Sequence, residues 1–87
     1  MYTVEYSSKA LKALQKLDRQ IAAMIYGWIE KNLIDCLDPR LYGKPLVGNK
    51  KGYWRYRVGS YRIIAEIHDH LVRVDIINVA HRSNVYD

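Results

Sequence analysis

The segment from residue 52 to residue 62 constrains the fold of this chain most, because it has the pattern of a β-hairpin: G-Y-W-R-Y-R-V-G-S-Y-R. Side chains along a strand point alternately to its two faces, so every second residue shares a face. Gly59-Ser60 is typical of a two-residue turn with glycine at its first central position. Such a turn pairs Arg57 with Arg62. The segment therefore predicts two antiparallel strands with a defined register.

The predicted register gathers three arginines on one face of the hairpin: Arg55, Arg57 and Arg62. Like charges that face each other destabilise a sheet, so stability alone does not explain this arrangement. The planar guanidinium group of arginine fits phosphate, which indicates a phosphate-binding surface. The alternative is a solvated basic face on an ordinary hairpin, because exposed cations are common. Two aromatic residues alternate with the arginines and are expected in the core: Trp54 and Tyr56.

Length and charge limit the classes of protein to which the chain can belong. The 87 residues have room for a single domain, residues 1–87. Fourteen Lys and Arg against nine Asp and Glu give a net charge of +5, which suits RNA, DNA, an anionic membrane surface or an acidic protein partner. One cysteine excludes an internal disulfide. No apolar run approaches membrane length and no signal sequence is evident, so we expect a cytoplasmic protein.

Two apolar stripes at helical spacing predict a pair of helices near residues 8–17 and 19–36. Ser7 or Ser8 can cap the first helix, and Asp18 can cap the second. A short alternating segment before them predicts a strand at the N-terminus.

Three further strands are expected near residues 53–58, 61–68 and 71–80. The connector that precedes them, residues 38–51, is long for a domain of this size, and Leu46 and Val47 are expected to anchor it. The element order is then β-α-α-β-β-β. This order predicts an α+β fold in which two helices pack on one face of a mainly antiparallel sheet.

The last strand is expected to bring further side chains to the arginine face. If Asp69-His70 forms a two-residue turn, Glu66 faces Arg73 in a surface ion pair. The same register places three residues of the last strand on the arginine face: Ile77, Val79 and His81. Arg82 would then follow beside the hairpin.

This surface has the residues that RNA cleavage by the neighbouring 2'-hydroxyl requires. That reaction needs proton transfer and cations around the developing negative charge. Arginine supplies charge but cannot accept a proton. His81 or Tyr86 could act as the base, the tyrosine only if nearby cations favour its phenolate, and the sequence leaves both open. No Cys/His spacing resembles a zinc site and no Gly-rich phosphate loop precedes a helix, so we expect no metal and no cofactor.

Two segments resemble the RelE group of the RelE/ParE toxin superfamily: G-K-P-L-V-G-N-K-K-G-Y-W-R-Y-R-V-G-S-Y-R-I-I and A-H-R-S-N-V-Y. The resemblance extends over nearly the whole chain. It implies a RelE-like toxin of a type II toxin–antitoxin pair, an endoribonuclease that enters the ribosomal A site, cuts mRNA without a metal and inhibits translation. It also implies a hetero-oligomer with a RelB-like antitoxin that carries an acidic segment, and no membrane partner.

By position, the resemblance assigns five functional residues: Arg55, Arg57, Arg62, Arg82 and Tyr86. The best-known member of the group has lysines where this chain has Arg55 and Arg57. Lysine can exchange a proton and arginine effectively cannot, so proton transfer is expected from Tyr86 or His81. The alternative function is that of a ParE-like inhibitor of DNA gyrase without nuclease activity. The basic and aromatic positions favour the nuclease, because a gyrase inhibitor has no need of them.

Overall fold

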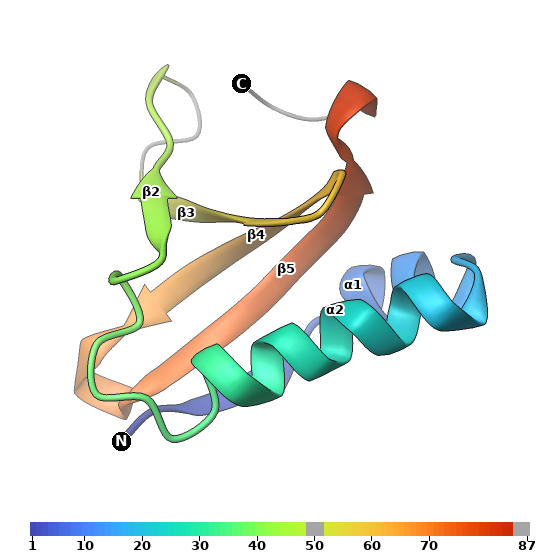
Figure 1. Ribbon diagram of the computed structural model, residues 1–87. Coiled ribbons are helices and arrows are strands. Elements are labelled where there is room, and N and C mark those ends of the chain that lie inside the picture. The colour runs from blue at the N-terminus through green and yellow to red at the C-terminus, as the bar shows by residue number, and fades with distance from the viewer. Residues whose placement is uncertain (49–51, 85–87) are drawn as a thin grey trace.

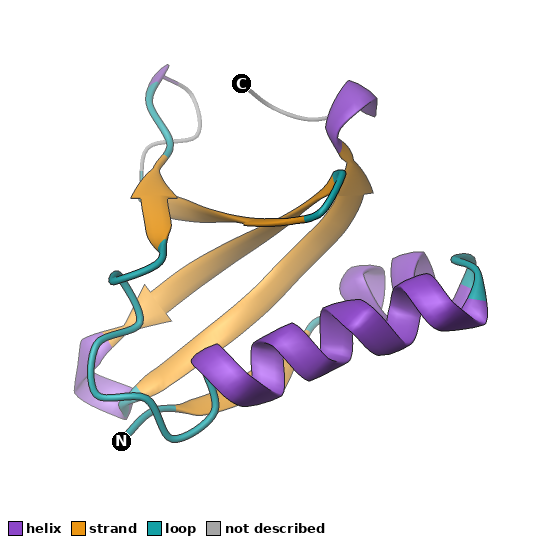
Figure 2. Ribbon diagram, viewed as in Figure 1, coloured by secondary structure: helices purple, strands orange, loops and turns teal. Residues whose placement is uncertain are grey.

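A five-stranded sheet with two helices on one face forms the fold in our computed structural model, which describes residues 1–48 and 52–84 (Figures 1 and 2). In chain order the elements are β1 (Thr3–Tyr6), α1 (Ser8–Gln15), α2 (Arg19–Asn32), β2 (Gly43–Pro45), β3 (Tyr53–Val58), β4 (Tyr61–His68), η2 (Asp69–Leu71), β5 (Arg73–His81) and η3 (Arg82–Asn84). The strand order is β1-β5-β4-β3-β2, with β1 parallel to β5 and the other pairs antiparallel. The predicted α+β fold is confirmed, and β2 is an additional strand.

Both helices begin at capping residues that the sequence predicts. The Ser7 hydroxyl accepts a hydrogen bond from the Ala10 N–H at 3.0 Å, and the Asp18 carboxylate accepts one from the Gln20 N–H at 3.1 Å. Each bond satisfies an N–H group that has no partner within its helix.

The second helix ends at Asn32, four residues before the predicted end at residue 36. The chain leaves helical geometry because Asp35 has a left-handed φ of 60°. The Asp35 N–H donates to the Tyr2 carbonyl at 2.8 Å, and the Tyr2 N–H donates to the Cys36 carbonyl at 3.0 Å. These backbone bonds replace the last predicted turn of helix with a connection to the N-terminal strand.

The core lies between the two helices and the inner face of the sheet. Ten of its residues are at most 2% exposed: Ala10, Leu14, Ile25, Ile29, Leu33, Tyr56, Ile63, Ala65, Val74 and Ile76. Trp54, predicted to be buried, is only half-buried, and the Arg40 guanidinium lies over its ring at 5.6 Å. Among the described residues, no helix has both the length and the apolar character needed to cross a membrane.

The buried ring of Tyr56 fastens the connector to the sheet. Its centroid lies 5.4 Å from that of Trp28, and its hydroxyl donates a hydrogen bond to the Pro39 carbonyl. Burial raises the pKa of Tyr56 far above its usual value, so this hydroxyl stays protonated and donates. On β2, Gly43 pairs with Tyr56, and a Cβ at position 43 would lie 2.8 Å from the ring. Strand β2 therefore requires glycine at this position.

Other contacts hold Arg40 and Leu46 of the connector. The Arg40 guanidinium makes two hydrogen bonds to the Asp69 carboxylate, at 2.8 and 3.2 Å, and the Tyr2 hydroxyl donates a third at 2.7 Å. Leu46 is buried as predicted. Val47 is 83% exposed, so its predicted role as an anchor is wrong.

The connection between β4 and β5 differs from the predicted two-residue turn. Four residues, 69–72, join the strands through η2, and Val72 has a left-handed φ of 50°. Glu66 consequently faces Asp75, and the predicted pair of Glu66 with Arg73 is wrong. Arg73 instead donates two hydrogen bonds to Asp75, at 2.8 and 3.2 Å.

A β-bulge then changes the register along the same pair of strands. Ala65 pairs with Ile76 but Ile64 pairs with Asn78, which leaves Ile77 as the extra residue. A shift of one residue exchanges the two faces of a strand. Every residue of β5 after the bulge therefore points to the face opposite to the predicted one.

We expect Gly43→Ala to lower the free energy of unfolding by roughly 1–3 kcal/mol, because the added methyl group overlaps a buried ring that cannot move away. Urea denaturation measures this change. Gly27→Ala is the matched control: this glycine lies on exposed α2 surface with nothing within 4 Å of an added Cβ, so alanine should stabilise by up to about 1 kcal/mol. Equal stability of the two variants would contradict the proposed contact.

Candidate functional site

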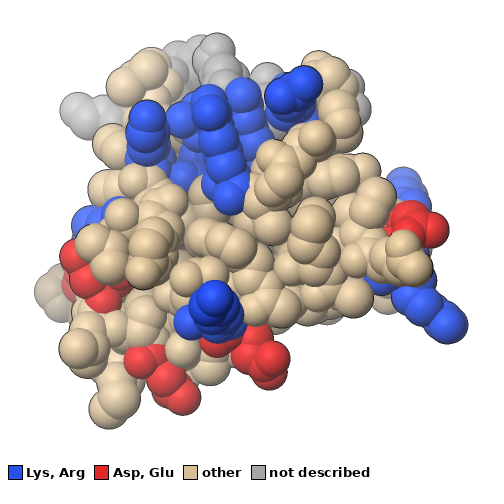
Figure 3. All heavy atoms as spheres, in the orientation of Figure 1, with Lys and Arg blue, Asp and Glu red and all other residues tan. Residues whose placement is uncertain are grey.

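Basic side chains gather on the open face of the sheet, which the helices do not cover. Figure 3 shows Lys and Arg atoms in one patch between β2 and η3. We call this patch the cationic surface and define it by five residues: Lys44, Arg55, Arg57, Arg62 and Arg82.

Strand pairing places these side chains. Lys44 faces Arg55 across β2 and β3, and Arg57 faces Arg62 across the predicted hairpin, which is confirmed. Directly paired residues share a face. Arg82 begins η3, and its N–H donates to the Ser60 carbonyl at 2.8 Å, which holds η3 against the hairpin turn.

The positive charges of this surface repel one another. Partial burial lowers the pKa of the Arg62 guanidinium, and the positive charges of three neighbours lower it further: Arg57, Arg55 and Arg82. Arginine nevertheless stays charged at neutral pH. The surface is therefore a fixed cluster of positive charge, and an anion bound there would relieve its repulsion.

Two residues that the sequence does not predict as part of the site lie beside the arginines: Lys44 on the edge strand β2, and Tyr42 directly before that strand. A shallow cavity of about 110 Å³ is lined by Tyr42, Lys44, Arg55 and Arg57. Tyr42 is 59% exposed. A strand of three residues is too short to show alternation, so the only signal in the sequence is a basic and an aromatic residue close together in a long connector.

The structure places His81 on the face opposite to Arg62, which corrects its predicted position. Because of the bulge, Arg62 faces Ala80, and His81 pairs with Tyr61. The His81 and Tyr61 rings meet edge-on at 5.2 Å, and His81 Nδ1 lies 2.9 Å from the Ser83 hydroxyl oxygen. Val79, also predicted on the arginine face, is buried in the core.

Four of the six predicted site residues thus come together: Arg55, Arg57, Arg62 and Arg82. Tyr86 lies outside the described residues, so its role stays a prediction.

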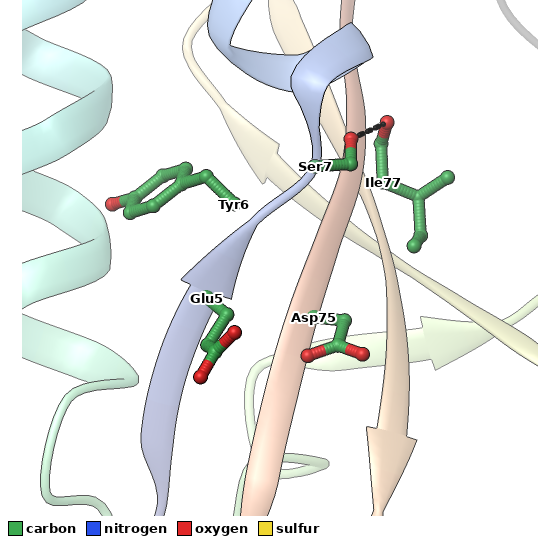
Figure 4. Close-up of a pocket in the computed structure, with 5 residues that line it drawn as sticks. All are labelled: Glu5, Tyr6, Ser7, Asp75 and Ile77. Atoms are coloured by element: carbon green, nitrogen blue, oxygen red, sulfur yellow. Dashed lines mark hydrogen bonds between the residues drawn. The ribbon is translucent and has the colours of Figure 1, made fainter.

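Acidic residues occupy the other end of the same sheet face. Glu5 faces Asp75, and Asp75 faces Glu66. Figure 4 shows the Glu5 and Asp75 carboxylates on neighbouring strands. The open face is therefore positive at the hairpin end and negative at the β1 end.

One group at the acidic end has the residue types of a metal site. His68 Nε2 lies 3.2 Å from Asp75 Oδ2 and 3.6 Å from Glu66 Oε1, and the three ligand atoms lie within 4.8 Å of one another. The Arg73 guanidinium already binds both oxygens of Asp75 and places a positive charge beside the group. This arrangement favours an ion-pair network over a bound cation.

Comparisons with known proteins relate this chain to bacterial toxins. Residues 4–86 match the family described as the ParE toxin of the type II toxin-antitoxin system, parDE. Toxin RelE of Mycobacterium tuberculosis is 35% identical over 85 residues, which cover 98% of this chain and 86% of the relative. Toxin RelG of the same organism is 33% identical, with coverage of 98% and 95%.

Solved structures of toxins are also similar to this chain in fold. A chain of the toxin-antitoxin complex RelBE2 from M. tuberculosis is 32% identical, with a TM-score of 0.86 and coverage of 95% of this chain and 93% of that chain. The isolated RelE toxin of E. coli, at 19% identity, a TM-score of 0.71 and coverage of 93% and 84%, shares the fold.

We expect Arg57→Gln to raise the temperature of thermal unfolding at low ionic strength, because the substitution removes a charge that repels Arg62. Sulfate should raise this temperature for the unaltered protein more than chloride does at equal ionic strength, since a bound dianion stabilises the folded state. The sulfate effect should be smaller in Arg57→Gln. Arg19→Gln, which removes an exposed charge from α2, is the control and should leave the effect unchanged. Equal sulfate effects in both variants would contradict an anion site.

Proposed function

The chain belongs to the RelE group of the RelE/ParE superfamily of type II toxins, and from this membership we propose that it is a ribosome-dependent endoribonuclease that cuts mRNA in the A site and inhibits translation. One observation carries the proposal: the cationic surface on the open face of the sheet. Fixed cations stabilise the negative charge that develops when a phosphodiester bond breaks. Their repulsion in the free protein supports an anionic substrate.

The proposed reaction uses the ribose 2'-hydroxyl as the nucleophile. A base removes its proton, the 2'-oxygen bonds to the adjacent phosphorus, and the bond to the 5'-oxygen of the next nucleotide breaks. An acid protonates that oxygen, so the products carry a 2',3'-cyclic phosphate and a 5'-hydroxyl. Arg55, Arg57, Arg62 and Arg82 stabilise the pentavalent phosphorane, and no step requires a metal ion.

Tyr86 is our proposed proton-transfer residue. The position of His81 supports this choice, because its ring packs on Tyr61 and is directed away from the face that holds Arg62. A phenol near several guanidinium groups loses its proton more readily than a free one.

A RelB-like antitoxin is the proposed partner. The related chain of M. tuberculosis, which is 32% identical, comes from the toxin-antitoxin complex RelBE2. An acidic segment of the antitoxin would neutralise the cationic surface, and such complementarity speeds association more than it adds affinity. The ribosomal target places the action of the toxin in the cytoplasm.

Expression of the chain without an antitoxin should arrest growth, with mRNA cut inside ribosome-bound codons. Arg62→Ala and Arg82→Ala should relieve the arrest, because each removes a charge that stabilises the transition state, by roughly 10²–10³-fold in cleavage rate. Growth curves and mapping of mRNA ends measure both effects. Arg19→Ala, on α2, is the control and should remain toxic.

The family match to ParE toxins makes gyrase inhibition the second candidate, and the same experiment separates the two. Persistent arrest in Arg62→Ala and Arg82→Ala, with intact mRNA and double-strand DNA breaks, would replace the nuclease with a gyrase inhibitor.

Tyr86→Phe should slow single-turnover cleavage on programmed ribosomes by roughly 10²–10⁴-fold, because it keeps the ring but removes the group that exchanges the proton. His81→Gln should cleave at a near-normal rate. The opposite order of rates would assign the base to His81. Products with 5'-phosphates would rule out attack by the 2'-hydroxyl.

A further inference from the structure

Edge strand β2 extends the cationic surface in an ordered way. Lys44 faces Arg55, and continuing this register by one residue places Tyr42 beside Arg57. The four side chains line one cavity of about 110 Å³. The cavity therefore has two cations of β3 on one side, and an aromatic ring and an amine of the β2 segment on the other.

This combination fits a nucleotide in a single strand. Proteins that bind single-stranded RNA combine cations that follow the phosphates with exposed aromatic rings on which bases stack. Tyr42 is 59% exposed and lines the cavity, so a ligand can reach it. Lys44 is also exposed and adds a charge in line with the arginines.

The charge distribution on the sheet indicates toward which edge of the sheet a bound RNA strand continues. Beyond Arg62 on β4, the open face continues to the carboxylates of Glu66 and Asp75, which repel phosphate. On the β2 side it continues to Lys44. Among the described residues, the attraction for a strand that leaves the arginines is therefore stronger toward β2 than toward Glu66 and Asp75.

The β2 segment is held in place before any ligand binds. Gly43 lies between Tyr42 and Lys44 and packs on the Tyr56 ring, whose hydroxyl bonds to Pro39. Strand β2 also pairs with β3 through three residues, and the Leu46 N–H donates to the Tyr53 carbonyl at 2.9 Å. Preorganisation of this kind lowers the entropy cost of binding.

We propose that Tyr42 and Lys44 form a nucleotide subsite at the β2 edge, in which the Tyr42 ring stacks on a base and Lys44 binds the phosphate of a nucleotide next to the one that the arginines hold. This inference rests on the proposed RNA substrate and extends it to a neighbouring nucleotide. In this subsite the aromatic ring would contact a base, whereas the arginines would contact phosphate.

Equilibrium binding of a short single-stranded RNA tests the subsite. Methylation of every 2'-hydroxyl prevents cleavage, and fluorescence anisotropy at low salt gives the dissociation constant. Tyr42→Ala should raise this constant roughly 10–100-fold, because it removes one stacked base. Tyr42→Phe keeps the ring and should bind nearly as well as the unaltered protein. Leu41→Ala is the matched control, since Leu41 is 66% exposed in the same turn, and it should have no effect.

Two further measurements assign the chemistry of each residue. An RNA backbone without bases should bind the unaltered protein and Tyr42→Ala equally, because neither can then form the stack. Lys44→Gln should reduce the slope of log K against log salt by about 0.7, the value for one phosphate contact on a single strand. Lys31→Gln, on exposed α2 surface, should leave the slope unchanged.

The outcomes separate this inference from the proposed function. Unchanged binding in Tyr42→Ala, or an equal loss with the backbone that lacks bases, would overturn the stacked nucleotide. An unchanged salt slope in Lys44→Gln would overturn the phosphate contact. If the unaltered chain cut no mRNA on ribosomes while its RNA binding still depended on Tyr42, the nuclease would fail and the subsite would stand.

Discussion

The packing of one buried ring, Tyr56, determines both the core and the site of this domain. Its burial against Trp28 fixes which face of β3 points inward. Because side chains alternate along a strand, its neighbours Arg55 and Arg57 must then lie on the open face. The same ring holds β2 through its close contact with Gly43. Without this contact, the arginines would lose the adjacent strand that carries Lys44.

The features that the sequence predicts correctly are those that residues close together in the chain determine. The hairpin register follows from a glycine turn and from alternation over eleven residues, and it places Arg55, Arg57 and Arg62 as observed. The β4–β5 register depends instead on a bulge and on a left-handed valine, Val72. A β-branched residue rarely adopts positive φ, so its identity gives no signal of the longer turn. The predicted position of His81 is wrong because the bulge shifts the register of β5 by one residue.

Strand β2 shows why part of the site could not be predicted. Its three residues have no alternating pattern, and the strand exists because Gly43 fits against a ring thirteen positions away in the sequence. Contacts between distant residues leave little trace in one sequence. The sequence therefore predicts only a connector for Lys44 and Tyr42, although both line one cavity with Arg55 and Arg57 in the structure.

The two faces of the sheet have separate roles, one in stability and one in the proposed binding. The inner face buries apolar side chains, which stabilise the fold, whereas the outer face brings arginines together at a cost in repulsion. Glu66 and Asp75, which could reduce that repulsion, lie at the other end of the outer face, and Asp75 is bonded to Arg73. Among the described residues, these carboxylates of the outer face thus lie away from the arginine cluster. Since β2 is attached to the core through Gly43, it is the element through which packing can alter binding.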